Sequence, residues 1–294
     1  MRFLLFFIAT ASAFGQVTSG SISGYVTDPS NRPINGAAII ASDSGHAVAR
    51  SAVTDLTGFY RFLDLPPGTY TVSAAASGFE RADAKDIHVE VDSHARVDLR
   101  PTIAGKGESV TITAQVRQLP TESSELGEVM ERSQIDSLPL EKRDFLQLAL
   151  LTPGVLPPVQ NSELSTRGNF AMHANGAREE YNNFLLDGVD NNDPDVNRYT
   201  LQPPVDAIQE FKISTNCYSA EYGRNAGGQV NVITRSGSNE LHGFAYEYLR
   251  NRDVDARNFF DGSQKPEYNR NQFGGGTGGP IVKNRLSFSR APTV

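Results

Sequence analysis

Short segments of alternating apolar and polar residues, separated by turn residues, dominate residues 20–100. Every second side chain is small or apolar in residues 22–26 and apolar in residues 87–91. Proline, asparagine, serine and glycine gather between such segments, for example at residues 28–31 and 66–68. Alternation with a period of two buries one face of a strand, and these residue types favour turns. The pattern therefore predicts a small antiparallel β-sandwich of the seven-stranded type.

The composition supports packed domains and argues against one class of partner. Hydrophobic residues make up 38% and charged residues 21% of the 294 residues, which suits about two folded domains. The 26 glycines and 16 prolines favour turns and short strands over long helices. A formal net charge of −7 disfavours nucleic acid as a partner. Cys217 is the one cysteine of the chain, so no internal disulfide is expected.

The N-terminus has the pattern of an export signal. Arg2 precedes an apolar run at residues 3–9, which is too short to cross a bilayer as a helix. Ala13 and Gly15 then offer a cleavage site, and we predict a signal peptide at residues 1–15. The alternative is a buried N-terminal strand. The expected mature protein is exported.

Residues 115–237 mix helical and strand patterns. An apolar run at residues 143–151, followed by Pro153 and Gly154, predicts a short helix. Short strands and one helical turn are expected at residues 184–186, 205–208, 211–213 and 230–233. This part of the chain therefore predicts an α+β unit.

Aromatic residues alternate near the C-terminus. Phe244, Tyr246 and Tyr248 share one face of an expected strand, and a long polar stretch follows as far as Asn271. A transmembrane barrel strand has this pattern, because one face meets lipid and the other faces the lumen. A half-buried strand of a soluble protein is the alternative. The next strand is expected to begin at residues 286–288.

Several strings resemble a known module and the family in which it occurs. Residues 21–28, 33–37, 54–60, 65–70 and 78–79 resemble the carboxypeptidase regulatory-like (transthyretin-like) domain. Residues 175–178, 182–192 and 218–237 are similar to the plug of TonB-dependent outer-membrane receptors. In one group of these receptors such a sandwich precedes the plug. The chain thus resembles the N-terminal part of a receptor of this group.

The resemblance implies a mainly β protein with an α+β plug and an incomplete β-barrel. The expected parts are a signal peptide (1–15), a β-sandwich (20–100), a linker (101–114), a plug domain (115–237) and the start of the outer-membrane barrel (238–294). Even the smallest closed barrel has about eight strands. We interpret the sequence as an N-terminal fragment. Residues 289–294 depart from the family pattern, in which an aromatic strand continues.

One segment of the linker resembles a TonB box, the handle by which TonB moves the plug. Its residues are Glu108, Ser109, Val110, Thr111, Ile112, Thr113 and Ala114. Such a segment pairs edge-on with a strand of TonB, and β-branched residues favour the extended state that this pairing needs. The alternative is that the segment forms the last strand of the sandwich.

The resemblance also suggests where substrate and barrel wall meet the plug. The candidate substrate contacts form a loop at the outward tip of the plug: Asp187, Asp190, Asn191, Asn192 and Asp193. The candidate plug–barrel contacts are Arg167, Arg178, Arg224 and Arg235, which can pair with acids on a polar barrel wall. The alternatives are a turn-rich loop and ordinary solvated surface charges.

Other chemistry finds little support in the sequence. Gly274, Gly276 and Gly279 fit G-x-G-x-x-G, but Pro280 follows where a dinucleotide fold needs a helix. Asp193 begins an EF-hand-like spacing that lacks the required glycine and glutamate. The motifs of zinc peptidases and serine hydrolases are missing. We therefore expect no enzyme, cofactor or bound metal.

The expected function is energised uptake across the outer membrane, with TonB and an unidentified small substrate, a glycan or a peptide, as partners. The alternative is an exported sandwich that binds carbohydrate or protein without transport.

Overall fold

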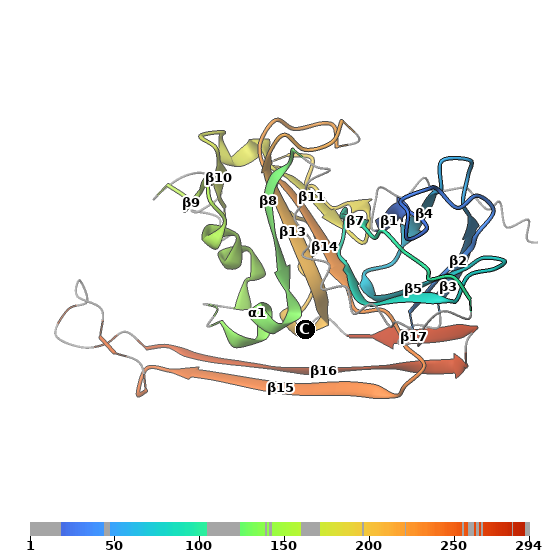
Figure 1. Cartoon of the computed structure of the whole chain (residues 1–294). Coiled ribbons are helices and arrows are strands. Elements are labelled where there is room, and N and C mark those ends of the chain that lie inside the picture. Colours follow the sequence, from blue (N-terminus) through green and yellow to red (C-terminus); the bar gives the residue numbers. More distant parts are fainter. Residues whose placement is uncertain are drawn as a thin grey trace, which may run out of the picture.

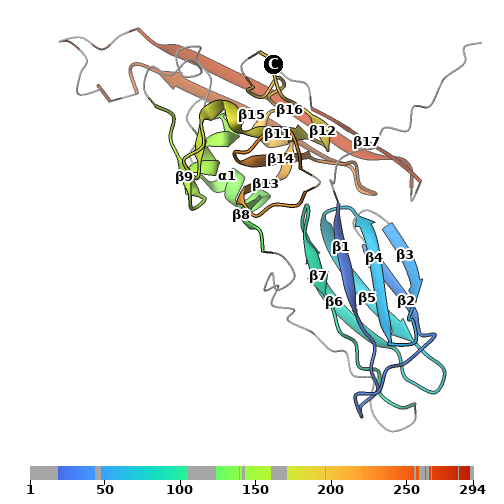
Figure 2. The same ribbon diagram turned by 90° about the horizontal axis from the view of Figure 1, so that it is seen from above.

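The computed structural model is mainly β, and its elements form three groups (Figures 1 and 2). It describes residues 19–43, 48–104, 124–138, 140, 143–159, 171–195, 197–220, 222–254, 256–257, 262, 265, 267–283 and 285–291. The predicted signal peptide (1–15), the TonB-box candidate (108–114) and Arg167 lie outside these described residues. The prediction of a mainly β fold with a sandwich, a plug-like α+β unit and barrel strands is confirmed.

The first group is a β-sandwich of two sheets. One sheet has the order β3 (Val48–Val53), β2 (Ala38–Asp43), β5 (Gly68–Ala75) and β6 (Ala82–Val89). The other has the order β4 (Phe59–Leu65), β1 (Gly20–Tyr25) and β7 (His94–Arg96). The seven strands match the predicted type. The pairing is antiparallel except that β1 and β7 run parallel, which the local sequence pattern did not predict.

The sandwich core follows from the alternation of its strands. Ile22, Ile39 and Val72 point inward and are fully buried between the sheets. Tyr60 is buried as well, and its hydroxyl donates a 2.6 Å hydrogen bond to the carbonyl of Val97, which satisfies its polar atom inside the core. The apolar face of each sheet is thus covered by the other.

The second group is a five-stranded sheet that we call the plug sheet. Its order is β12 (Val189–Asp190), β11 (Asn183–Leu186), β14 (Gln229–Thr234), β13 (Ile208–Asn216) and β8 (Leu126–Glu131). Strands β11 and β14 run parallel, and the other neighbours are antiparallel. A separate short pair joins β9 (Val155–Leu156) to β10 (His173–Ala174).

Short helical segments accompany the plug sheet, and most of them contribute apolar side chains to its hydrophobic core. They are α1 (Arg132–Ser137) and the 3-10 helices η2 (Phe145–Leu151), η3 (Glu179–Tyr181) and η4 (Val205–Ala207). Phe145 packs edge-on against Phe211 of β13, with ring centres 5.7 Å apart. The helix predicted at 143–151 begins at Phe145 as a 3-10 helix, because Arg143 has a left-handed backbone (φ 56°) and Asp144 caps the segment by accepting from the Leu146 amide.

The third group is a sheet of long strands that runs beside the plug sheet (Figure 2). Its order is β15 (His242–Asn251), β16 (Asn269–Val282) and β17 (Leu286–Arg290). The glycine-rich stretch lies in β16. Glycine suits these positions because the aromatic rings of β15 occupy the space that a larger side chain would need. A Cβ atom added to Gly276 lies 2.6 Å from the ring of Phe244, and one added to Gly274 lies 2.5 Å from the hydroxyl of Tyr246. No helix in the described part of the chain has the length and apolar character to cross a membrane.

Candidate functional site

The plug sheet has one apolar and one polar face, and both are buried. In β13, Phe211 and Ile213 belong to the hydrophobic core of the plug. Glu210, Lys212 and Ser214 alternate with them on the opposite face and are only 7%, 9% and 3% exposed. Since a buried polar group is costly unless it has a partner, this face must be matched by other polar groups.

Amide side chains supply many of these partners. The Asn183 side chain donates to the Gln229 side chain (2.8 Å), and the Asn192 side chain donates to Asn183 (2.6 Å). Asn182 is 1% exposed; it donates to the Met172 carbonyl and accepts from the Gly228 amide. These amides tie β11 to the neighbouring loops and explain why the string at residues 182–192 is rich in asparagine.

Asp187 forms a tight turn at the end of β11. Asp187 and Gly188 both have positive φ angles, 48° and 76°, as a type I′ hairpin turn between β11 and β12 requires. The exposed Asp187 carboxylate accepts hydrogen bonds from the backbone amide and the hydroxyl of Thr234, each 2.8 Å long. Its side chain therefore fixes the end of β14.

The rest of the predicted loop divides into exposed and internal side chains. Asp190 is ion-paired with Arg224 at 2.5 Å, and both side chains are about half exposed. Partial burial raises the pKa of Asp190, but hydrogen bonds from Asn192 and the charge of Arg224 outweigh it and hold the pKa below its usual range. Asn191 is buried and bonded to the backbone of Leu201.

Asp193 completes this loop. Its carboxylate lies 3.6 Å from the guanidinium of Arg198 and accepts from the Asp195 amide. Among the described residues, no group of three or more His, Cys, Asp or Glu side chains is arranged to hold a metal ion. Asp190, paired with Arg224 from outside the loop, and Asp187 are the carboxylates of the loop that are exposed to solvent.

A cluster of arginines connects the plug region to β15. The guanidinium of Arg143 lies 4.1 Å from the ring centre of Tyr248 and 2.9 Å from Asp206. Arg132 approaches the same carboxylate at 3.8 Å. The Asp206 side chain is buried, with 9% of the residue exposed. The two nearby guanidinium groups balance its charge, which would otherwise be costly to bury. Arg143 was not among the arginines predicted to contact the barrel; the available signal in the sequence was its place directly before Asp144, which caps the helix that follows.

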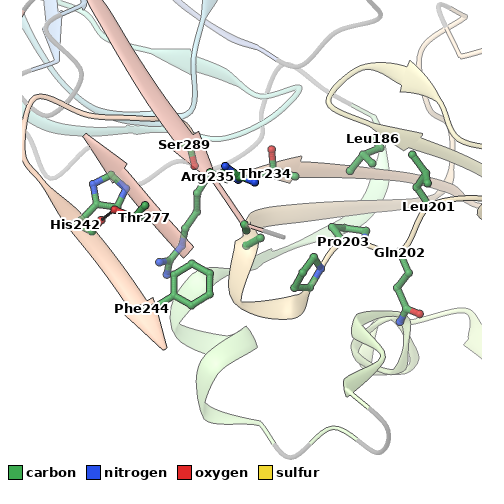
Figure 3. A pocket seen from close by; sticks show the side chains of 14 residues that line it. Leu186, Leu201, Gln202, Pro203, Thr234, Arg235, His242, Phe244, Thr277 and Ser289 are labelled. Atoms are coloured by element: carbon green, nitrogen blue, oxygen red, sulfur yellow. Dashed lines mark hydrogen bonds between the residues drawn. The ribbon is translucent and has the colours of Figure 1, made fainter. Parts of the chain in front are cut away.

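Arg235 makes a second contact of the same kind. Its guanidinium lies 5.5 Å from the ring centre of Phe244, and Figure 3 shows the side chain directed toward that ring. Burial, and then the neighbouring charge of Arg132, lower the pKa of Arg235. Arg178 is exposed. Of the three described arginines predicted to contact the barrel, the structure thus places Arg235 against a strand of the third sheet.

A pocket of about 390 Å³ lies between the plug region and the third sheet (Figure 3). Leu186, Pro203 and Thr234 line it from the plug side, and His242 and Phe244 line it from β15. Its wall is mainly apolar, with cationic side chains at the edge. The pocket marks the space where the two groups of elements meet.

Comparisons with known proteins agree with this arrangement. A family model described as a carboxypeptidase regulatory-like domain matches residues 21–102, and one described as an outer membrane beta barrel domain matches residues 233–289. The TonB-dependent transporter Oar of Myxococcus xanthus is 28% identical over 295 residues, which cover 95% of this chain and 27% of that protein. The resemblance to TonB-dependent outer-membrane receptors is confirmed.

A second relative of the receptor-like chain is the probable TonB-dependent siderophore receptor PirA of Acinetobacter baumannii. It is 28% identical over 205 residues, which cover 64% of this chain and 25% of that protein. In the comparison with its solved structure, 24% of residues are identical, the match covers 56% of this chain and 23% of that one, and the TM-score is 0.43. The chain spans about a quarter of the length of the curated relatives it matches.

The barrel match and the two relatives support an outer-membrane location. The relatives are named as a transporter and a receptor, and neither name is that of an enzyme.

Proposed function

We propose that the chain forms the TonB-linked end of an outer-membrane receptor that takes up a small substrate. The observation that carries this proposal is the order of the parts along one chain. A regulatory-like sandwich precedes a five-stranded sheet, and the plug region that contains this sheet is joined through Arg143 and Arg235 to the aromatic strand β15 of a barrel-like sheet. The similarity to a TonB-dependent transporter extends over 95% of the chain and supports the same order.

In this proposal residues 108–114 pair with a strand of TonB. Val110, Thr111 and Ile112 favour the extended backbone, and main-chain hydrogen bonds supply the affinity. The segment stands between the sandwich and β8, so a partner that holds it can act on the plug sheet directly. Residues 1–15 direct export, which leaves the sandwich and the plug on the periplasmic side. Fusion of residues 1–19 to a reporter enzyme that is active only outside the cytoplasm tests the export signal.

For the substrate, the exposed pair of Asp190 and Arg224 is the proposed contact within the loop that contains Asp187, Asn191, Asn192 and Asp193. It offers both signs of charge to a polar ligand. The relative in A. baumannii is named as a siderophore receptor. A glycan or a peptide also fits a site of this polarity.

Co-purification of the full chain with the periplasmic domain of TonB tests the coupling. We expect wild-type chain to retain TonB and both Val110→Pro and Ile112→Pro to lose most of the bound TonB, because proline removes a backbone donor from the pairing segment. Val116→Pro is the matched control, since it lies in the same stretch outside residues 108–114. Equal retention by all four proteins would remove the TonB-box assignment.

A further inference from the structure

The turn between β6 and β7 of the sandwich lies against the polar face of β13. Val91 in this turn is fully buried, yet it belongs to neither hydrophobic cluster of the described residues. Its backbone amide donates a 2.7 Å hydrogen bond to the Glu210 carboxylate. Figure 2 shows this end of the sandwich turned toward the plug sheet. The burial of Val91 therefore comes from contact between the two domains.

A buried group of three charges stands beside this contact. The Lys212 ammonium lies 2.9 Å from the Asp92 carboxylate and 2.6 Å from the Glu125 carboxylate, and it also donates to the Asp92 carbonyl at 3.0 Å. The three side chains are 11–12% exposed. Tyr222 adds a hydrogen bond to Asp92. Lys212 thus joins the sandwich, the entrance to β8 and the centre of the plug sheet.

We propose that the sandwich docks on the plug through a releasable clasp made of Val91, Asp92, Glu125, Glu210 and Lys212. Polar contacts that include charges suit release, because water replaces each of them when the domains separate. Glu125 lies ahead of β8, so a pull on the preceding chain reaches Lys212 through it. That last step rests on the proposed function, whereas the docking does not.

Glu210, which accepts from the Val91 amide, makes the clasp sensitive to pH. Burial, followed by the neighbouring Glu90 and Glu131 carboxylates, raises the pKa of Glu210 to about 7, although the Val91 amide opposes the shift. Burial and Glu131 also raise the pKa of Glu90, against the charges of Lys212 and His88. The charged and titratable groups that face the junction besides Glu210 are Glu90, Glu131, Lys212, His88, Asp92, Glu125 and Tyr222.

The sign of the effect follows from the two states of Glu210. When the sandwich is released, water reaches the carboxyl and its pKa returns toward the ordinary value of 4.5. The docked state holds the proton more tightly. The contribution of Glu210 to docking is therefore fully present below pH 4.5, is lost as the pH rises from 4.5 to about 7, and changes little above that.

The test is a distance measurement between spin labels on the two domains of the full chain. Cys217, exposed directly after β13, carries one label, and Lys85→Cys on the outside of β6 carries the other. At pH 5 we expect one narrow distance distribution. At pH 8 the population of molecules with a released sandwich should be about tenfold larger or more than at pH 5. Lys212→Met should broaden the distribution at both values.

Glu210→Gln separates the pH effect from the docking. Its neutral amide oxygen still accepts from Val91, so we expect a narrow distribution at both pH values. Asp98→Asn, at an exposed ion pair of the sandwich, is the control and should behave like the wild type. If Lys212→Met fails to fold by circular dichroism, Asp92→Asn replaces it, because asparagine tolerates the left-handed backbone at this position (φ 50°).

Two results overturn the clasp. One is that replacement of Lys212 or Asp92 leaves the same narrow distribution as in the wild type. The other is that Glu210→Gln shows a pH response as large as that of the wild type. TonB takes no part in the measurement, so a failure here leaves the proposed function standing. Loss of TonB binding, in turn, would leave the docking intact.

Discussion

The guanidinium of Arg143 lies over the ring of Tyr248, 4.1 Å from its centre, while it pairs with Asp206 at 2.9 Å. One side chain thus connects the plug region to the first strand of the neighbouring sheet. Arg143 has a left-handed backbone (φ 56°) just ahead of the 3-10 helix that begins at Phe145. Together with the contact of Arg235 on Phe244, it holds the plug region against β15.

Replacement of Arg143 should loosen this contact. Arg143→Ala removes the cation–π interaction and one of the two cations near the buried Asp206, and we expect a loss of about 2 kcal/mol in the free energy of unfolding. Arg143→Lys keeps the charge without the planar stacking and should lose about half as much. Urea denaturation followed by circular dichroism measures both. Equal stability of wild type and Arg143→Ala would show that the contact does not hold the two parts together.

The turn at Asp187 gives a second prediction. Asp187→Ala removes two hydrogen bonds to Thr234 and disfavours the left-handed backbone, so it should cost about 1–2 kcal/mol of stability. Asp187→Asn is the matched control, because Asn-Gly also suits a type I′ turn; it should lose less than about 1 kcal/mol. The same denaturation experiment reports both variants. The reverse order of stability would contradict the role assigned to this turn.

Asn182 gives a third prediction. The side chain is 1% exposed and bonds to the Met172 and Glu179 carbonyls and the Gly228 amide. Asn182→Ala leaves these backbone groups buried without a partner, and we expect about 3 kcal/mol of destabilisation. Asn216→Ala at an exposed position should change the melting temperature little. A neutral change shifts the melting temperature by only about one or two degrees. A shift this small for Asn182→Ala would be inconsistent with the role assigned to Asn182.

Local patterns predicted much of the fold. The strands around Ile22, Tyr60 and Ile87 were expected because their alternation is set by neighbours in the sequence. Strand β8 and helix α1 were missed, because residues 126–137 contain few apolar residues and gain their burial from β13. The glycine-rich part of β16 was not expected to be a strand, since the aromatic rings that cover it belong to β15.

The contacts between parts were harder to predict. Lys212 stands between two core residues of β13. A charged residue in an apolar strand implies a partner of opposite charge, but the local sequence does not show which residue that is. Its partners, Asp92 and Glu125, are 120 and 87 residues away along the chain. The candidate loop was predicted as a group, but the sequence did not separate the internal Asn191 from the exposed Asp190, because both lie in the same polar stretch.

Contact between residues 108–114 and TonB is the central claim, and photocrosslinking in living cells tests it most directly. Ile112 is replaced by the photoreactive amino acid p-benzoylphenylalanine in the full chain, and Val116 is replaced in the same way as the control. We predict a covalent adduct with TonB at position 112, identified by mass spectrometry, and little or none at position 116. Absence of a TonB adduct at 112, with the chain present in the outer membrane, would contradict the account.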